Sequence, residues 1–441
     1  MTPGSIRDVA VAARRAAHRL AASPDAERRA ALEAFSRLLL ARRAEVEGEN
    51  ARDLAAAEAL AARGELAKVL VDRLSIKGSK LDAAAEMVRA VAVLPDPLNQ
   101  TLRATLLDDA LRLYQVTVPI GVVACAFESR PDAAVQMAAL AIRSGNAILL
   151  KGGREAASTN RVVVALAREA LRETGLPEDA VALLEAREDL MALLALDDLV
   201  DLVVPRGSSD FVKLIQRNTR IPVMGHAEGV CHLYVDRAAD LGKALHVSHD
   251  AKLDYPAACN AVECFLIHRE KAARFVPLLV STLAVKGVEV RGDDAVRALA
   301  PQAKEATEAD WGREFGDLAC AMRVVDSLEE AIAHINRYGS KHTDGILTED
   351  KEAARRFVQE VDSAGVFVNA STRFADGYRY GLGAEVGIST GKLHARGPVG
   401  LEGLTSTKWV LHGEGHAAAP YRGDAPRSFK HARLQEEYRG E

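Results

Sequence analysis

The sequence is poor in aromatic residues, in cysteine and in long apolar runs, and each scarcity excludes a class of protein. Aromatic residues make up only 5% of the 441 residues, so the core must consist mainly of Ala, Val, Leu and Ile. The five cysteines are scattered, without a CxxC pair: Cys125, Cys231, Cys259, Cys264 and Cys320. An odd, scattered set argues against a disulfide framework and against a structural zinc site, and we expect no metal.

No apolar run reaches the roughly 20 residues that a membrane helix needs. The segment 190–204 comes near, but three aspartates interrupt it. The first residues lack the apolar stretch of a secretory signal, and their arginines fit an amphipathic first helix as well as a transit peptide. A net charge of -5 does not suit a generally basic nucleic-acid binder. We therefore expect a protein of the reducing cytosol, with no membrane or nucleic-acid partner.

The length of 441 residues exceeds what one ordinary hydrophobic core supports, so we expect two or three domains. Three- and four-residue apolar spacing predicts helices over most of 1–93, and alternation over 101–118 predicts a hairpin or extended arm. From 116 to 228 strands and helices alternate, which is typical of a parallel, doubly wound sheet. A similar α/β pattern runs over 229–374. Beyond it lie a Gly-rich stretch and a polar tail from about 412, which we expect to be poorly ordered.

Two turns in the first α/β region could bind a nucleotide. Residues 203–208 run from a strand into a Gly207-Ser208 turn before a helix, where free backbone N–H groups favour a phosphate. An ordinary turn with Ser as N-cap explains this stretch as well, and no GxGxxG fingerprint is present. The second turn, Lys151 to Arg154 with two glycines between, follows the predicted strand 147–150. Ligands of open parallel sheets sit beyond such strand ends, although solvated charge is the alternative.

Cys259 is the candidate nucleophile. Small residues precede it, and a helix-like stretch after it would lower the pKa of its thiol. The alternative is a buried, inert cysteine, which is the common case and which we expect for Cys264. Among the histidines, His226 and His232 flank Cys231, and His246 and His249 lie three residues apart, so a metal site is conceivable. No carboxylate or cysteine completes either pair at a familiar ligand spacing, so structural or surface roles are expected. Arg373 and Arg396 in the Gly-rich region could hold a carboxylate, or that region could be structural only.

Together these stretches resemble the gamma-glutamyl phosphate reductases, a family of the aldehyde dehydrogenase superfamily. The resemblance covers about 5–410 and rests on long motifs in the family's order. They are VPIGVV (118–123), FESRPD (127–132), SGNAILLKGG (144–153), VPRGS (204–208), IPVMGH (221–226), CHLYVD (231–236), ACNAVE (258–263), VNASTRF (368–374), GLGAE (381–385) and KLHARGP (392–398).

The resemblance implies an α/β, aldehyde dehydrogenase-like fold. Its parts would be a Rossmann-like NADPH-binding domain over 1–228, with the arm hairpin near 101–118, and an α/β catalytic domain over 229–374. A return segment over 375–411 would lead back to the cofactor domain and a small oligomerisation arm, before the polar tail 412–441. We therefore expect a homo-oligomer. Association with glutamate 5-kinase is a further expectation, because acyl phosphates are labile.

The implied activity is NADPH-dependent reduction of L-glutamyl 5-phosphate to L-glutamate 5-semialdehyde and phosphate, the second step of proline biosynthesis. Cys259 aligns with the family's nucleophile, and backbone N–H groups around Asn260 would hold the oxyanion. Further residues would bind the cofactor and the substrate carboxylate. Lys151 and Arg154 would contact the adenosine ribose and the 2′-phosphate, and Gly207 and Ser208 would contact the pyrophosphate. Glu314 would bind the nicotinamide ribose, and Arg373 and Arg396 would bind the substrate.

The sequence departs from its relatives at several points. The Glu-Leu-Gly-Gly motif of hydrolytic aldehyde dehydrogenases is absent, and 224–229 reads MGHAEG instead. Near the nucleophile, 253–255 and Cys264 differ from the family's usual residues, and Gly391 replaces a common Gln. These changes put substrate affinity in doubt rather than the nucleophile. Two alternatives remain: a hydrolytic aldehyde dehydrogenase of the same superfamily, and a non-catalytic nucleotide-binding protein.

Overall fold

The computed structural model describes residues 5–65, 71, 73–128, 130–186, 188–226 and 228–439. Residues 1–4, 66–70 and 72 of the predicted helical region, Ser129 and Ala227 of the quoted motifs, and residues 440–441 of the tail lie outside this part of the chain. The chain divides into two compact units. The first comprises 1–207, 214–223 and 400–441, and the second comprises 208–213 and 224–399.

The first unit is built on a parallel four-stranded sheet in the order β5-β4-β3-β6. Its strands are β3 (Val122–Phe127), β4 (Ala147–Lys151), β5 (Val181–Leu183) and β6 (Leu202–Arg206). The predicted alternation of strand and helix over 116–228 is confirmed. The helices between these strands are α6 (Pro131–Arg143), α7 (Ala157–Glu173) and α8 (Asp189–Leu194), and α9 (Ser209–Arg217) follows β6. Short 3₁₀ turns η1 (Arg154–Ala156) and η2 (Glu178–Ala180) precede α7 and β5.

The described residues of the N-terminal region form mainly helices, as the apolar spacing predicts. These helices include α1 (Ile6–Ala21), α2 (Asp25–Ala41), α3 (Arg43–Ala62) and α5 (Ser79–Ala92). Helix α1 begins with a capping box in which Ser5 and Asp8 satisfy each other's backbone N–H groups. Its buried side chains are mostly alanines, so neighbouring elements can approach it closely. Within the described residues, no helix is both long and apolar enough to cross a bilayer.

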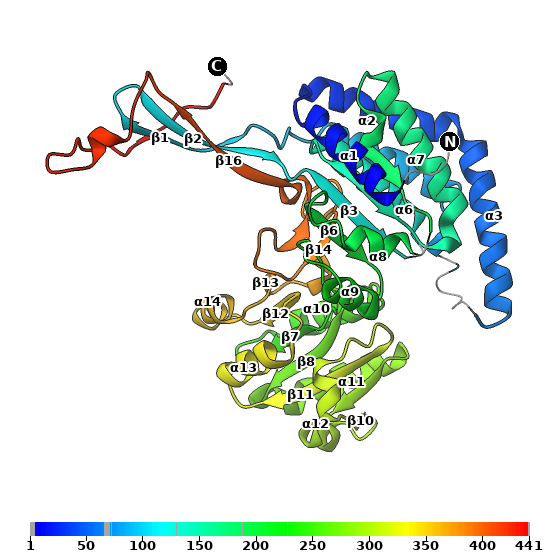
Figure 1. Cartoon of the computed structure of the whole chain (residues 1–441). Helices are drawn as coiled ribbons and strands as arrows, with labels where there is room; N and C mark the ends of the chain where they lie inside the picture. The colour runs from blue at the N-terminus through cyan, green and yellow to red at the C-terminus, as the bar shows by residue number, and fades with distance from the viewer. Residues whose placement is uncertain are drawn as a thin grey trace. The chain divides into compact units, whose positions relative to one another are not determined.

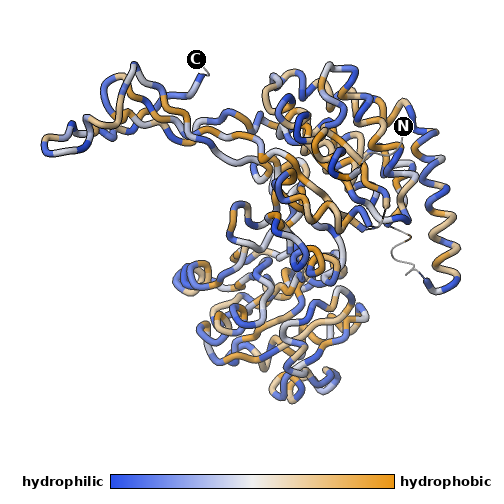
Figure 2. Tube along the Cα trace, in the orientation of Figure 1, coloured by the Kyte–Doolittle hydropathy of each residue, from blue (hydrophilic) through white to orange (hydrophobic). Residues whose placement is uncertain are grey.

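A second sheet in the first unit is antiparallel and forms an arm, visible as a ribbon extending from α1 and its neighbours (Figure 1). Its order is β16-β2-β1-β17. The strands are β1 (Thr101–Asp108), β2 (Leu111–Pro119), β16 (Thr405–His412) and β17 (Ala432–Leu434), with η5 (Leu401–Leu404) and η6 (Ala419–Tyr421) beside them in the chain. Hydrophilic and hydrophobic residues alternate along this arm (Figure 2). The expectation of a poorly ordered tail is wrong at 432–434, because β17 pairs with β1 there.

The second unit is built on a seven-stranded, wholly parallel sheet in the order β10-β9-β11-β8-β7-β12-β13. Its strands are β7 (Cys231–Val235), β8 (Val262–His268), β9 (Glu289–Gly292), β10 (Lys304–Glu305), β11 (Ala319–Val325), β12 (Thr343–Leu347) and β13 (Gly365–Val368). The α-helices are α10 (Leu241–Leu253), α11 (Arg269–Val285), α12 (Asp294–Leu299), α13 (Leu328–Tyr338) and α14 (Lys351–Glu360). The remaining elements are η3 (Glu308–Gly312), η4 (Thr372–Phe374) and the pair β14 (Gly387–Ser389) and β15 (Gly397–Val399).

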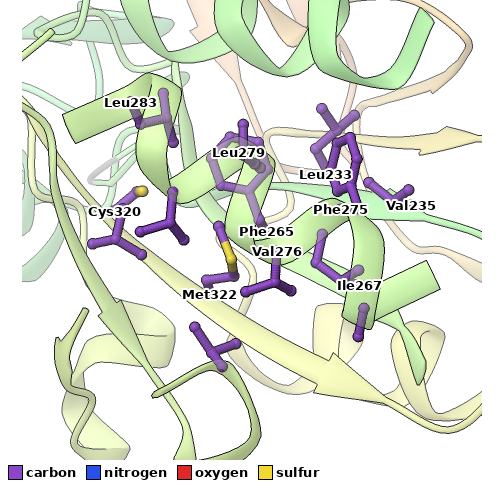
Figure 3. Close-up of a cluster of buried hydrophobic side chains, with 14 of the residues drawn as sticks. Leu233, Val235, Phe265, Ile267, Phe275, Val276, Leu279, Leu283, Cys320 and Met322 are labelled. Atoms are coloured by element: carbon purple, nitrogen blue, oxygen red, sulfur yellow. The ribbon is translucent and has the colours of Figure 1, made fainter. Parts of the chain in front are cut away.

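One face of this second sheet packs against α11. Figure 3 shows side chains from β7, β8 and β11 meeting those of α11 in a continuous buried cluster. Phe265 and Phe275 are fully buried there, as are Leu279 and Leu283. Burial of each such side chain contributes about 1.5–3 kcal/mol. The cluster therefore fixes β8, the strand that follows the candidate nucleophile, together with its neighbour β7.

Candidate active site

Cys259 lies in a turn between α10 and β8 and is partly exposed. The predicted helix-like stretch after it is wrong, because strand β8 begins at Val262. The apolar residues there are fully buried, and a buried strand and a buried helix give the same short apolar run. The helix-terminus argument for a lowered thiol pKa therefore does not apply to Cys259.

The amino ends of three adjacent parallel strands meet near Cys259. Strand β7 begins opposite the start of β8, with Cys231 aligned to Val262, and β12 lies on the other side of β7. Residues that precede these strands are therefore neighbours in space although they are distant in sequence. Cys231 illustrates this, because its thiol donates to the Cys259 carbonyl at 3.3 Å. Burial raises the pKa of the Cys231 thiol well above its usual value, so it stays protonated.

Asn260 and Arg373 hold the Cys259 turn in place. The Asn260 side-chain amide donates to the Ala375 carbonyl at 2.9 Å, and its oxygen accepts from the Arg373 guanidinium. Arg373 also donates to Asp254 at 3.0 Å, and Arg379 reaches the same carboxylate oxygen at 3.1 Å. Hydrogen bonds from Arg379 and then Arg373 lower the pKa of Asp254. The sequence singled out neither Arg379 nor this role of Asp254, because the partners lie more than 100 residues apart.

Gly229 allows a second segment to press against Cys259. A Cβ at this position would lie 2.2 Å from the Cys259 carbonyl oxygen and 2.6 Å from its Cα. No side chain fits, so glycine is required for this close approach. The Gly229 N–H donates to Glu314 at 2.9 Å. Glu314, predicted to meet a ribose, is thereby hydrogen-bonded to the segment that contacts the nucleophile's turn.

His226 and His342 complete the surroundings of the thiol. One ligand-type atom from each of His226, Cys259 and His342 lies within 4.8 Å of the others. Sequence reasoning considered His226 but missed His342, which lies 83 residues after the cysteine. The one sequence feature that could have indicated His342 is its position directly before a buried strand.

A buried ion pair lies on the elements that flank this turn. Lys252 at the end of α10 contacts Glu263 on β8 at 2.8 Å, and both side chains are fully buried. Burial raises the pKa of Glu263 to about 7 despite the nearby ammonium group. Glu263 also accepts from the Gly316 N–H at 3.1 Å, which fastens the segment carrying Glu314.

The predicted nucleotide residues of the first unit share one sheet edge. Lys151 ends β4, opposite Ala126 of β3, and Arg206 at the end of β6 aligns with Phe127 of β3. Lys151 and Gly207 therefore lie at the carboxyl ends of strands on either side of β3. The Lys151 ammonium is nearly buried and donates to the Gly152 carbonyl at 2.8 Å, and burial lowers its pKa.

The other residues predicted to bind the nucleotide are Arg154 and Ser208, which lie in different units. Arg154 is exposed on η1. Ser208 belongs to the second unit, and its hydroxyl accepts from the Phe211 N–H at 3.4 Å in the manner of an N-cap.

Arg396 lies in a separate charged cluster of the second unit. It donates to the Asp362 carboxylate at 3.0 Å, and Lys392 and Lys341 reach the same carboxyl group at 2.9 and 3.4 Å. These contacts, the Lys392 hydrogen bond first, lower the pKa of Asp362 to about 2. In the structure Arg373 and Arg396 are thus each bound to a different carboxylate of the chain itself.

Comparisons with known proteins agree on one family. The aldehyde dehydrogenase family model matches residues 1–310. The gamma-glutamyl phosphate reductase of Natronomonas pharaonis is 54% identical over 98% of this chain and 97% of its own length. The crystal structure of gamma-glutamyl phosphate reductase from Thermotoga maritima matches with a TM-score of 0.91 and 40% identity, covering 94% of this chain and all of that one.

A more distant structure shares the fold alone. Glyceraldehyde-3-phosphate dehydrogenase from Methanocaldococcus jannaschii, solved in complex with NADP, aligns with a TM-score of 0.64 and 16% identity over 93% of this chain and 94% of its own. The aldehyde dehydrogenase-like α/β fold expected from the sequence is confirmed. The chain belongs to the aldehyde dehydrogenase family and, within it, to the gamma-glutamyl phosphate reductases.

Proposed function

We propose that this protein reduces L-glutamyl 5-phosphate to L-glutamate 5-semialdehyde and phosphate with NADPH, the second step of proline biosynthesis. The observation that carries the proposal is the placement of Cys259. The thiol is partly exposed in a turn that Asn260, Arg373 and Gly229 fix from two sides, and the chain belongs to the matching family.

In the proposed reaction, the Cys259 thiolate attacks the acyl carbon of the substrate. A carbon–sulfur bond forms, the carbon–oxygen bond to phosphate breaks, and phosphate leaves with the bonding electrons, so a thioester remains. His226 is placed to accept the thiol proton, since its ring lies beside the sulfur. The Asn260 N–H makes no backbone hydrogen bond within the described residues and is available to the developing oxyanion. When bound, NADPH supplies the hydride that reduces the thioester carbon. Loss of the Cys259 thiolate then releases the aldehyde.

Glu228 argues against the hydrolytic alternative. A hydrolytic enzyme needs a carboxylate near the nucleophile that can take a proton from water. The Glu228 carboxylate instead accepts hydrogen bonds from Lys213 and from Ser209, the latter at 3.1 Å. The Lys213 contact is the main cause of its lowered pKa, which makes Glu228 a weak base. Release of the thioester by phosphate is therefore favoured over release by water.

We assign the cofactor to Lys151, Arg154, Gly207, Ser208 and Glu314. The residues present fit a nucleotide, because Lys151 is nearly buried and has ammonium hydrogens to donate beyond its one bond to Gly152. Ribose hydroxyls would satisfy them. A Cβ on Gly152 would lie 2.2 Å from the Asn160 amide nitrogen, so the backbone at this strand end is closely packed and fixed. Arg154 would hold the 2′-phosphate that distinguishes NADPH from NADH.

Arg373 is the first candidate for the substrate carboxylate, with Arg396 as the second. Arg373 is linked to Asn260, so a carboxylate bound there would lie near the nucleophile's turn. Arg396 is held by Asp362, and its Nε atom is buried without a hydrogen-bond partner within the described residues. Replacing each arginine by lysine in turn should show which one binds the substrate carboxylate. Only the substitution of that arginine should raise the substrate KM strongly.

We also propose a homo-oligomer in a reducing cytosol. The arm presents exposed apolar side chains, Trp409 and Leu411 on β16 and Leu102 on β1, and β16 is an edge strand. Such surfaces are typical of association between chains. All five cysteines lie in the described part of the chain and none forms a disulfide, which fits a reducing compartment. Association with glutamate 5-kinase is proposed on the lability of the acyl phosphate alone.

Trapping the thioester tests the proposal. The protein is incubated with glutamate 5-semialdehyde and NADP⁺ without phosphate, then digested and analysed by tandem mass spectrometry. We expect the glutamyl group on the Cys259 peptide and its removal when inorganic phosphate is added. A glutamyl group on no cysteine, or one that water removes as fast as phosphate does, would overturn the proposal. Cys264 provides the internal control, because it is buried on β8 and should never be modified.

A further inference from the structure

Three side chains of a metal-binding type meet in the second unit. His226 precedes β7, Cys259 precedes β8 and His342 directly precedes β12, and these strands are neighbours in one parallel sheet. Their ligand-type atoms all lie within 4.8 Å of one another. Two imidazoles and one thiolate are ligands that suit Zn²⁺ and related borderline-soft ions.

Hydrogen bonding prepares His226 as a ligand. Its Nδ1 lies 2.9 Å from the Ile388 carbonyl oxygen, which can only accept, so Nδ1 carries the proton. The lone pair then resides on Nε2. A histidine that donates its other ring N–H to a backbone carbonyl is the usual arrangement in metal sites, since it fixes the ring and its tautomer.

His342 offers a second lone pair. The residue is fully buried. Its Nδ1 lies 2.9 Å from the Thr343 hydroxyl. Its Nε2 is buried and has no hydrogen-bond partner within the described residues. A buried polar atom without a partner is costly and rare, and a bound ion would satisfy it.

The geometry needs only a small adjustment. With Zn–S near 2.3 Å and Zn–N near 2.0–2.1 Å, tetrahedral ligands are separated by roughly 3.3–3.6 Å. Side-chain movements of about 1 Å would therefore close the trio around an ion. Cys259 and His226 are partly exposed, so an ion can enter and a water molecule can take the fourth position.

We propose that His226, Cys259 and His342 form an inhibitory site for Zn²⁺. On binding, the thiol proton passes to solvent and the sulfur lone pair that would attack the acyl carbon is donated to the metal instead. The enzyme is then blocked until a chelator removes the ion. This inference rests on the trio's geometry and does not require the proposed reductase activity.

A second trio in the same unit provides a matched control. His232, Cys264 and His334 also lie within 4.8 Å of one another, but all three are fully or almost fully buried. The His232 Nδ1 contacts Asp344 at 3.1 Å, and the Arg323 guanidinium lies 3.2 Å from the His334 Nδ1. A fixed positive charge and the lack of access exclude a cation there.

Cobalt absorption spectroscopy tests the site without relying on activity. Reduced, metal-free full-length protein is titrated with Co²⁺, then with Zn²⁺ as competitor. We expect one equivalent of Co²⁺ to give a sulfur-to-cobalt charge-transfer band with tetrahedral d–d bands, all abolished by Zn²⁺. Cys259→Ser should remove the charge-transfer band, and His226→Gln and His342→Gln should weaken Co²⁺ binding at least tenfold. Cys264→Ser should leave the spectrum unchanged, and circular dichroism checks that each variant folds.

The outcomes separate this site from the proposed function. Absence of the charge-transfer band in the unmodified protein, its persistence in Cys259→Ser, or its loss in Cys264→Ser would each overturn the proposal. Because Cys259→Ser changes one atom in a partly exposed turn, its result stands even if a histidine variant does not fold. In a parallel arm, Zn²⁺ should inhibit the reductase at least tenfold, reversibly with a chelator. If no reductase activity exists, the cobalt spectrum still decides the metal site.

Discussion

Replacing Gly229 by alanine should damage catalysis chiefly by displacing Cys259. The added Cβ would lie 2.2 Å from the Cys259 carbonyl oxygen and 2.6 Å from both its Cα and its Cβ. Real Cβ atoms do not approach closer than 3.0 Å, so the two segments must separate by about 0.8 Å. All three of these atoms belong to Cys259 itself and two of them are backbone, so a side-chain rotation cannot relieve the contact.

The size of the effect follows from that displacement. A misplacement of about 1 Å at a reacting group costs on the order of 100-fold in rate. We therefore expect Gly229→Ala to lower kcat/KM about 100-fold, equivalent to about 2.7 kcal/mol of transition-state stabilisation. Overpacking of this kind also lowers the free energy of unfolding by about 1–3 kcal/mol. The Gly229 N–H contact to Glu314 should weaken as well, so the KM for the cofactor should rise.

Steady-state kinetics with a matched control tests this reasoning. Gly48 lies within α3, and a Cβ added there would meet no neighbouring group within 4 Å among the described residues. Gly48→Ala therefore adds the same methyl group without a contact. It should keep full activity and gain up to about 1 kcal/mol of stability. Both variants are measured in the phosphate-dependent reverse reaction and by thermal unfolding. A folded Gly229→Ala protein with more than half of the original kcat/KM would refute the argument.

Three further predictions concern charged residues. Lys252→Met should lower the free energy of unfolding by about 3–5 kcal/mol in urea titrations, because it leaves the fully buried Glu263 without its partner; a loss below about 1 kcal/mol would contradict this. Lys151→Ala should raise the KM for NADPH at least tenfold with a smaller change in kcat, and an unchanged KM would remove Lys151 from the cofactor site. Asp362, whose pKa is lowered to about 2, stabilises the fold above its ordinary pKa near 4, and this contribution disappears as the pH falls through 2. Asp362→Asn should therefore lose less stability than the unmodified protein between pH 4 and pH 2, and parallel losses would count against the assignment.

Local sequence patterns predicted the elements well where neighbouring residues decide the structure. The strand expected at 147–150 is β4, and the alternation of strands and helices expected over 116–228 is present, because the spacing of apolar residues there follows each element's own period. The helix expected after Cys259 is strand β8 instead, since a short apolar run does not distinguish a buried strand from a helix. Strand β17 was missed because its apolar signal is weak and its pairing with β1 is more than 300 residues distant in sequence.

The candidate site shows the same division. Cys259 could be named from its small neighbours and the family motifs, whereas His342 could not, because only the order of strands in the sheet brings it to the thiol. The role of the Asp254 carboxylate, which binds both Arg373 and Arg379, could likewise not be predicted from the sequence. Contacts of this kind depend on topology, which no local pattern records.

The most direct test of the central claim is the phosphate dependence of the reverse reaction. NADP⁺ reduction by glutamate 5-semialdehyde is followed with and without inorganic phosphate, in the unmodified protein and in Cys259→Ala. We predict a rate that requires phosphate and is absent in the variant, because phosphate must release the thioester from Cys259. An equal rate without phosphate would mean that water releases the acyl group, and a rate that survives in Cys259→Ala would mean that this cysteine is not the nucleophile.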